Sequence, residues 1–136
     1  MTKQKNFSVR IADQIYETDM VICVGEYKFY QNYLKKYHNE KPKEQCFFGG
    51  ESQYLLSEYK GKLISENVVW IPRLDFTYSN CAVLAHEILH SVFHLFKVVG
   101  IKLDYENHEA INYYFEFLYR ESLLKLSKYY NKSRKK

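Results

Sequence analysis

Apolar residues follow two different patterns along the chain, short continuous runs and helical spacing, and each predicts a type of element. The runs at residues 20–24 and 67–71 are short, apolar and rich in β-branched side chains, which is typical of buried strands. Pro72 ends the second run, because proline cannot donate to a strand ladder. Residues 46–50 predict a short strand leading into a turn. Segments 53–59 and 62–64 flank Gly61 and predict a hairpin.

Helical spacing dominates the rest of the chain. Apolar positions three and four residues apart predict an amphipathic helix over residues 26–38 and another over residues 81–99. Thr77, Ser79 and Asn80 are competent N-caps for the second of these helices, and Gly100 suits its C-terminal end. A third helix, capped by Asp104 or Asn107, is predicted to continue to about Tyr129. This order of elements predicts a single α+β domain over residues 1–136, with a small twisted sheet.

Composition narrows the class of protein. The chain has 136 residues, 46% of them apolar, and this is enough for one core. Residues 1–10 carry charges and no apolar run, and uncharged runs elsewhere are shorter than a membrane span, so we expect a cytoplasmic protein without membrane contact. Cys23, Cys46 and Cys81 are odd in number and form no C-x-x-C pair, which predicts free thiols in a reducing compartment.

The positive charge is concentrated at the C-terminal end. The net charge is +4, and residues 125–136 contain six basic residues and no acidic one. A solvated, fraying basic tail from about residue 125 is one interpretation, and contact with nucleic acid or another polyanion is the alternative.

The residues with the clearest chemistry are His86-Glu87-x-x-His90, inside the second predicted helix. Histidines four residues apart lie one turn above each other on one helix face, so both imidazoles can bind one cation, and zinc is the expected metal. Glu87 then acts as general base toward a metal-bound water. The apolar flanks predict that the helix is buried, and a buried His pair needs a partner such as a metal. The alternative is an ordinary solvated or core histidine cluster.

A catalytic zinc needs a third protein ligand. His94 is about 12 Å along the helix axis from His86, too far to share one ion with both motif histidines. An antiparallel third helix would bring its first turns to the motif. Its candidates are Glu106, His108 and Glu109, although acidic residues at this position also favour the helix dipole.

Three segments carry a family resemblance: Val69-Trp70-Ile71-Pro72-Arg73, Leu84-Ala85-His86-Glu87 and Glu109-Ala110. Together with the order of elements, they make residues 68–118 similar to gluzincin-type zincins, and especially to small zincin-like proteins of phages and prophages. The resemblance implies a zincin-like fold in which the helix after the motif helix carries the third zinc ligand, Glu109. It also implies that the strand before the motif helix is an edge that binds an extended peptide through Val69, Trp70 and Ile71.

Further roles depend on that arrangement. Tyr113 shares a helix face with Glu109 and is the candidate donor to a transition-state oxyanion, with Tyr105 as the next. Glu116 is a candidate to orient a ligand histidine. The longer signature with a glycine and a third histidine is absent, since Phe93 and Phe96 occupy those positions.

These patterns favour a zinc-dependent peptidase or hydrolase of narrow specificity that acts on a peptide or protein. The alternative is a catalytically inactive or weak zincin-fold binding protein of phage or mobile-element origin. The chain is short for a peptidase with a two-sided cleft, which supports the alternative. The intact Glu87 supports the enzyme, because structural zinc needs no base.

Overall fold

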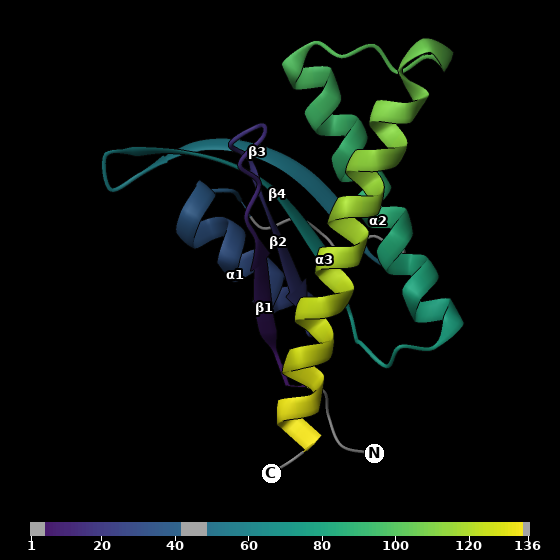
Figure 1. Ribbon diagram of the computed structural model, residues 1–136. Coiled ribbons are helices and arrows are strands. Elements are labelled where there is room, and N and C mark those ends of the chain that lie inside the picture. Colours follow the sequence, from purple (N-terminus) through teal and green to yellow (C-terminus); the bar gives the residue numbers. More distant parts are fainter. Residues whose placement is uncertain (1–4, 42–48, 135–136) are drawn as a thin grey trace.

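The structure is a computed structural model that describes residues 5–41 and 49–134. The described part is an α+β fold with a small mixed sheet of four strands and three α-helices (Figure 1). The elements in chain order are β1 (Phe7–Ile11), β2 (Asp19–Val24), α1 (Tyr27–His38), β3 (Glu51–Tyr59), β4 (Lys62–Ile71), α2 (Tyr78–Val99), the 3-10 turn η1 (Tyr105–Asn107) and α3 (His108–Arg134).

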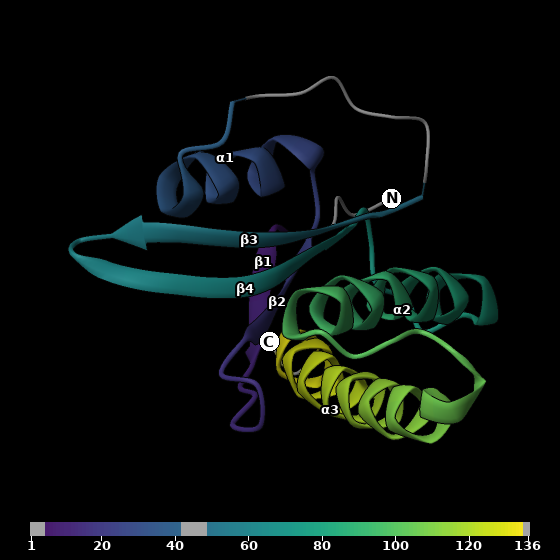
Figure 2. The same ribbon diagram turned by 90° about the horizontal axis from the view of Figure 1, so that it is seen from above.

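The sheet has the strand order β1-β2-β4-β3, so β4 is an inner strand and β3 is an edge. The central strands β2 and β4 run parallel, and both outer pairs are antiparallel. Helix α1 covers one face of the sheet, and α2 and α3 cover the other (Figure 2). This explains the continuous apolar run in β2. Met20, Ile22 and Val24 belong to the core under α2 and α3, while Val21 and Cys23 belong to the core under α1.

Helix α2 has the caps that the sequence predicts. The Thr77 side chain accepts a hydrogen bond from the Asn80 backbone N–H, and Gly100 ends the helix in the left-handed conformation with φ 81°. Among the described helices, α2 alone is long and apolar enough to span a membrane by length and composition. Eight of its 22 residues are buried, and the apolar ones among them belong to the core that α2 shares with the sheet and α3.

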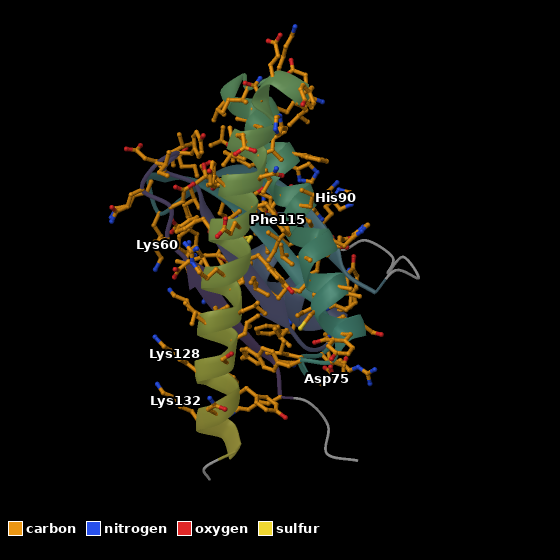
Figure 3. The ribbon with its side chains drawn as sticks, turned by 45° about the vertical axis from the view of Figure 1, so that its right-hand side comes forward. Lys60, Asp75, His90, Phe115, Lys128 and Lys132 are labelled. Carbon is orange, nitrogen blue, oxygen red and sulfur yellow. The ribbon has the colours of Figure 1, made fainter. Side chains whose placement is uncertain are left out.

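Helix α3 runs antiparallel to α2 and continues to Arg134, five residues beyond the predicted end (Figure 1). Residues 125–134 are therefore helical, and the prediction of a fraying tail from about residue 125 is wrong for this part. The physical reason is packing onto β1. Leu126 is fully buried in the core, and the rings of Phe7 and Tyr129 stack with centroids 3.7 Å apart. Lys128 and Lys132 point away from the fold (Figure 3), and polyanion binding remains a prediction.

A polar cluster that surrounds the buried Glu66 joins α1 to the sheet on the face opposite α2. We call it the Glu66 cluster; it consists of Arg10, Tyr33, His38 and Glu66. The Glu66 carboxylate is bonded to His38 Nε2 at 2.6 Å, accepts from the Tyr33 hydroxyl at 2.7 Å and pairs with the Arg10 guanidinium at 3.0 Å. Burial disfavours ionisation of Glu66, but the bonds from His38 and Tyr33 and the charge of Arg10 outweigh it and lower its pKa.

Two strands differ from their predicted form. Residues 7–11 form β1, a strand that the sequence analysis does not predict, although Phe7, Val9 and Ile11 alternate with polar residues in the pattern typical of a half-buried strand. The predicted segments 62–64 and 67–71 are one continuous strand, β4, because Ser65 and Glu66 find polar partners inside the fold. Residues 46–48 of the predicted short strand lie outside the described residues, and Gly49 and Gly50 precede β3.

Candidate functional site

His86 and His90 project from the middle of α2, one turn apart, on the side away from α3. Their Nε2 atoms are 3.1 Å apart, and the ring centroids are separated by 4.7 Å. Figure 3 shows His90 on one side of α2 and Phe115 of α3 on the other. The α-helical repeat accounts for the pairing, because residues four apart share a face.

The spacing of this pair fits a divalent cation. Two imidazole nitrogens bound to one tetrahedral zinc at about 2.05 Å are about 3.3 Å apart, close to the observed separation. The same distance also suits a hydrogen bond between neutral rings. The expectation that the pair is buried is wrong, since the His86 side chain is 68% exposed and His90 is also exposed. The core side of α2 is filled instead by residues such as Leu84, Ile88 and Val92. The pair is thus accessible from solvent.

Glu87 is the buried member of the motif. Its side chain is 8% exposed, and Oε1 lies 4.0 Å from His86 Nε2. Burial raises the pKa of Glu87, with a smaller contribution from the charge of Glu51, while His86 and His90 act in the opposite direction. A raised pKa brings this carboxyl nearer the range in which a side chain exchanges protons at neutral pH.

Gly50 makes room for Glu87. A Cβ added at Gly50 would lie 2.9 Å from Glu87 Cγ and 3.0 Å from the Trp70 carbonyl oxygen. The chain entering β3 therefore passes directly over the Glu87 side chain, and only glycine allows this approach. Two residues after Gly50, Ser52 Oγ is 2.9 Å from Ser91 Oγ, which joins β3 to α2 beside the motif.

A cavity of about 660 Å³ lies between the start of β3 and α2. It is lined by residues 49–52 and by Ala82, Val83, His86, Glu87, His90 and His94. A second hollow of about 510 Å³ shares Glu51, Ser52 and His94 with the first and is also lined by Gln53, Tyr54, Lys97 and Val98. The two together form a trough along the edge strand, which we call the β3–α2 groove.

His94 stands where the two hollows meet. Its ring stacks on His90 with centroids 6.1 Å apart, and its buried Nδ1 has no hydrogen-bond partner among the described residues. Burial lowers the pKa of His94, and the charges of His90 and Lys97 lower it further. Helix geometry excludes His94 as a shared ligand with both motif histidines, and the structure makes it part of the groove wall.

The structure does not bring Glu109 together with the histidine pair. In residues 5–41 and 49–134, no group of three His, Cys, Asp or Glu side chains is arranged to hold a metal ion. Helix α2 continues for nine residues after His90, about 13 Å, before the chain turns back. Glu109 therefore begins α3 level with the far end of α2, where it is 62% exposed and lies 3.4 Å from His108. Glu106 on η1 is also exposed at this end.

The candidates for the oxyanion donor and for orienting a ligand histidine lie outside the groove. Tyr113 and Tyr105 are 67% and 84% exposed and do not line either hollow. Glu116 pairs with Arg120 at 3.3 Å on the exposed side of α3. These positions follow from the packing of α3 against the side of α2 opposite His90. In the described residues, α3 thus contributes nothing to the histidine site.

The prediction that Val69, Trp70 and Ile71 form a peptide-binding edge is wrong. They belong to β4, which is paired with β2 on one side and β3 on the other, and all three are buried. The sheet edge next to the motif helix is β3. Pro72 and the position of β4 directly before the motif helix had indicated β4 as this edge. The Gly49-Gly50 pair, which is typical of a turn, was the available signal for the passage of the chain over Glu87.

Comparisons of the chain with protein-family models, with curated proteins and with solved structures found no match.

Proposed function

We propose that the protein is a zinc-dependent peptidase or related hydrolase of narrow specificity. The observation that supports this most strongly is the combination of two exposed imidazoles, with Nε2 atoms 3.1 Å apart, and a shielded carboxyl on the same helix turn at the floor of a groove. The zincin resemblance of residues 68–118 and the fit of the histidine spacing to zinc support the same proposal.

Each residue has a defined task in this proposal. His86 and His90 would hold the metal, which would lower the pKa of a bound water and polarise a carbonyl. Glu87 accepts the proton of the attacking water and returns it to the leaving amine. Its burial beneath Gly50 keeps the carboxyl away from bulk solvent and fixes its position relative to His86.

The substrate in this proposal is an extended peptide in the β3–α2 groove. One edge of β3 is not paired with any described strand, so its backbone groups can add a further strand. In this proposal the peptide pairs with residues 51–54 of β3 and not with β4.

The third metal ligand separates this proposal from its alternative. Among the described residues, the protein supplies two ligands to the site, and a two-ligand site holds zinc weakly. The alternative function, a zincin-fold binding protein with weak or no catalysis, is favoured by this observation. In both cases the β3–α2 groove is the surface where a peptide binds.

Zinc titration against a chromogenic chelator, followed by digestion of a defined peptide mixture, tests the proposal. We expect one zinc per chain in the wild type, loss of zinc in His90→Ala, and retention of zinc in Glu87→Gln. We also expect cleavage by the zinc-loaded wild type that falls by at least about 100-fold in Glu87→Gln. Zinc binding without any cleavage would refute the enzyme and leave the binding protein. Absence of zinc binding would refute the metal site in both the enzyme and the binding protein.

A further inference from the structure

The β3–α2 groove extends well past the histidine pair, and its two ends differ in charge. At the motif end, the first hollow contains Glu87 between His86 and His90. At the far end, the second hollow is lined by Lys97 and Val98. The charged residues that line this second hollow are Glu51 and Lys97.

The Glu51 carboxylate is hydrogen-bonded to residues other than Lys97. It accepts hydrogen bonds from the Tyr27 hydroxyl at 3.4 Å and from Gln53 Nε2 at 3.3 Å, on the face of the sheet that α1 covers. Lys97 is exposed and forms no ion pair with any carboxylate of the described residues. The far end of the groove therefore presents a positive charge that the fold itself does not neutralise.

The direction of a bound peptide follows from the elements that line the groove. Residues 49–52, which lead into β3, face residues 82–94 of α2, and residues 51–54 of β3 face residues 94–98, so β3 and α2 run in the same direction along the groove. A peptide that pairs antiparallel with β3, the more stable pairing, runs the other way. Its residues on the N-terminal side of the bond at the histidine pair then extend toward Lys97.

The distance determines which residue of the peptide meets Lys97. Lys97 is seven residues beyond His90, about 10.5 Å along the helix axis. An extended strand advances about 3.4 Å per residue, so about three peptide residues cover this distance.

We propose that the β3–α2 groove selects extended peptides with an acidic side chain about three residues before the cleaved bond, and that Lys97 is the partner of that side chain. This inference rests on the proposed peptidase function and adds a substrate class to it. A lysine in the last turn of a helix also stabilises the helix dipole, so the test must separate this structural effect from recognition.

The test uses the zinc-loaded full chain and a mixture of unrelated synthetic peptides in which every residue type occurs at every position. Cleavage products identified by mass spectrometry give the residue frequencies around each cut. We expect Asp and Glu to be enriched about three positions before the cut. In Lys97→Glu, the enrichment should change to Lys and Arg. The matched control is Lys102→Glu, which makes the same change of charge at an exposed residue that lines neither hollow, and it should keep the wild-type preference.

A binding measurement gives a second readout that does not depend on turnover. The best-cleaved peptide and its Glu→Gln counterpart are labelled with fluorescein and titrated with the Glu87→Gln protein. We expect the acidic peptide to bind about fivefold more tightly, and Lys97→Glu to remove this difference.

The outcomes are distinguishable. Cleavage without an acidic preference before the cut, a preference after the cut, or a preference that Lys97→Glu leaves unchanged would overturn this inference and leave the proposed function intact. No cleavage by the wild type, with zinc bound, would refute the proposed function and this inference with it.

Discussion

The Gly50→Ala substitution tests the contact that places Glu87. The added methyl group would lie 2.9 Å from Glu87 Cγ and 3.0 Å from the Trp70 carbonyl oxygen, both shorter than normal contacts. The Trp70 oxygen belongs to the backbone of an inner strand and cannot move without disturbing the sheet. The strain therefore acts mainly on the Glu87 side chain and on the start of β3.

The adjacent glycine provides a matched control. A Cβ at Gly49 would lie 3.6 Å and 3.8 Å from the two Val83 methyl groups, which is ordinary van der Waals contact. Replacement of Gly49 by alanine should be neutral or stabilise the fold by about 0.4–1 kcal/mol, because alanine reduces the freedom of the unfolded chain. Overpacking at Gly50 costs about 1–3 kcal/mol. We expect the two variants to differ by about 2 kcal/mol in the free energy of unfolding.

Urea unfolding followed by tryptophan fluorescence measures this difference. With a slope of about 2 kcal/mol per molar urea, the midpoint of Gly50→Ala should lie about 1 M below that of Gly49→Ala. Zinc affinity should be equal in both variants, because the atoms that the new methyl group at Gly50 would meet belong to Glu87 and Trp70 and not to His86 or His90. Peptide cleavage should fall in Gly50→Ala alone. Equal stability and equal activity in the two variants would refute the close passage of β3 over Glu87.

Three further predictions concern other parts of the molecule. In Glu66→Gln, an uncharged amide replaces the carboxylate and weakens its bonds within the Glu66 cluster, which should lower the free energy of unfolding by about 2–3 kcal/mol at pH 7. Since the pKa of Glu66 is lowered in the folded state, this loss should shrink as the pH falls below about 4.3, and urea midpoints measured across pH will show it. Glu109→Ala should leave zinc affinity unchanged, while His90→Ala should lower it by more than about 100-fold. A loss of zinc affinity in Glu109→Ala would mean that the start of α3 contacts the histidine pair when metal is bound. Leu126→Ala should cost about 2–5 kcal/mol and its exposed neighbour Leu124→Ala less than about 0.5, and equal small effects would contradict the packing of α3 on the sheet.

The predictions concern three different parts of the molecule around the histidine pair. The histidine pair and Glu87 are positioned by one helix, and β3 supplies the shield over Glu87 and the wall of the groove. The zinc titration reports on the helix, the Gly50 substitution reports on β3, and the Lys97 substitution reports on the far end of the groove. If one of these three measurements contradicts its prediction while the other two agree, the description of the corresponding part is wrong.

Local patterns predicted the parts of the fold that depend on neighbouring residues. The helix limits near Thr77 and Gly100 follow from capping chemistry, and the pairing of His86 with His90 follows from the helical repeat. The apolar run in β2 correctly indicated a strand buried on both faces. The end of α3 was predicted too early, because Leu126 and Tyr129 are stabilised by β1, which lies more than 100 residues earlier in the chain.

Local patterns were sufficient to predict the α+β class, the helix that carries His86, Glu87 and His90, and the shared direction of the two imidazoles, since these depend on the backbone geometry of single elements. The surroundings of that motif depend on tertiary packing. It placed β4 inside the sheet and β3 at the edge, buried Glu87 while leaving His86 exposed, and packed α3 on the side of α2 away from the histidines. The physical reason is that a repeat determines which side chains share a face, whereas the partner of that face depends on how distant apolar surfaces bury one another.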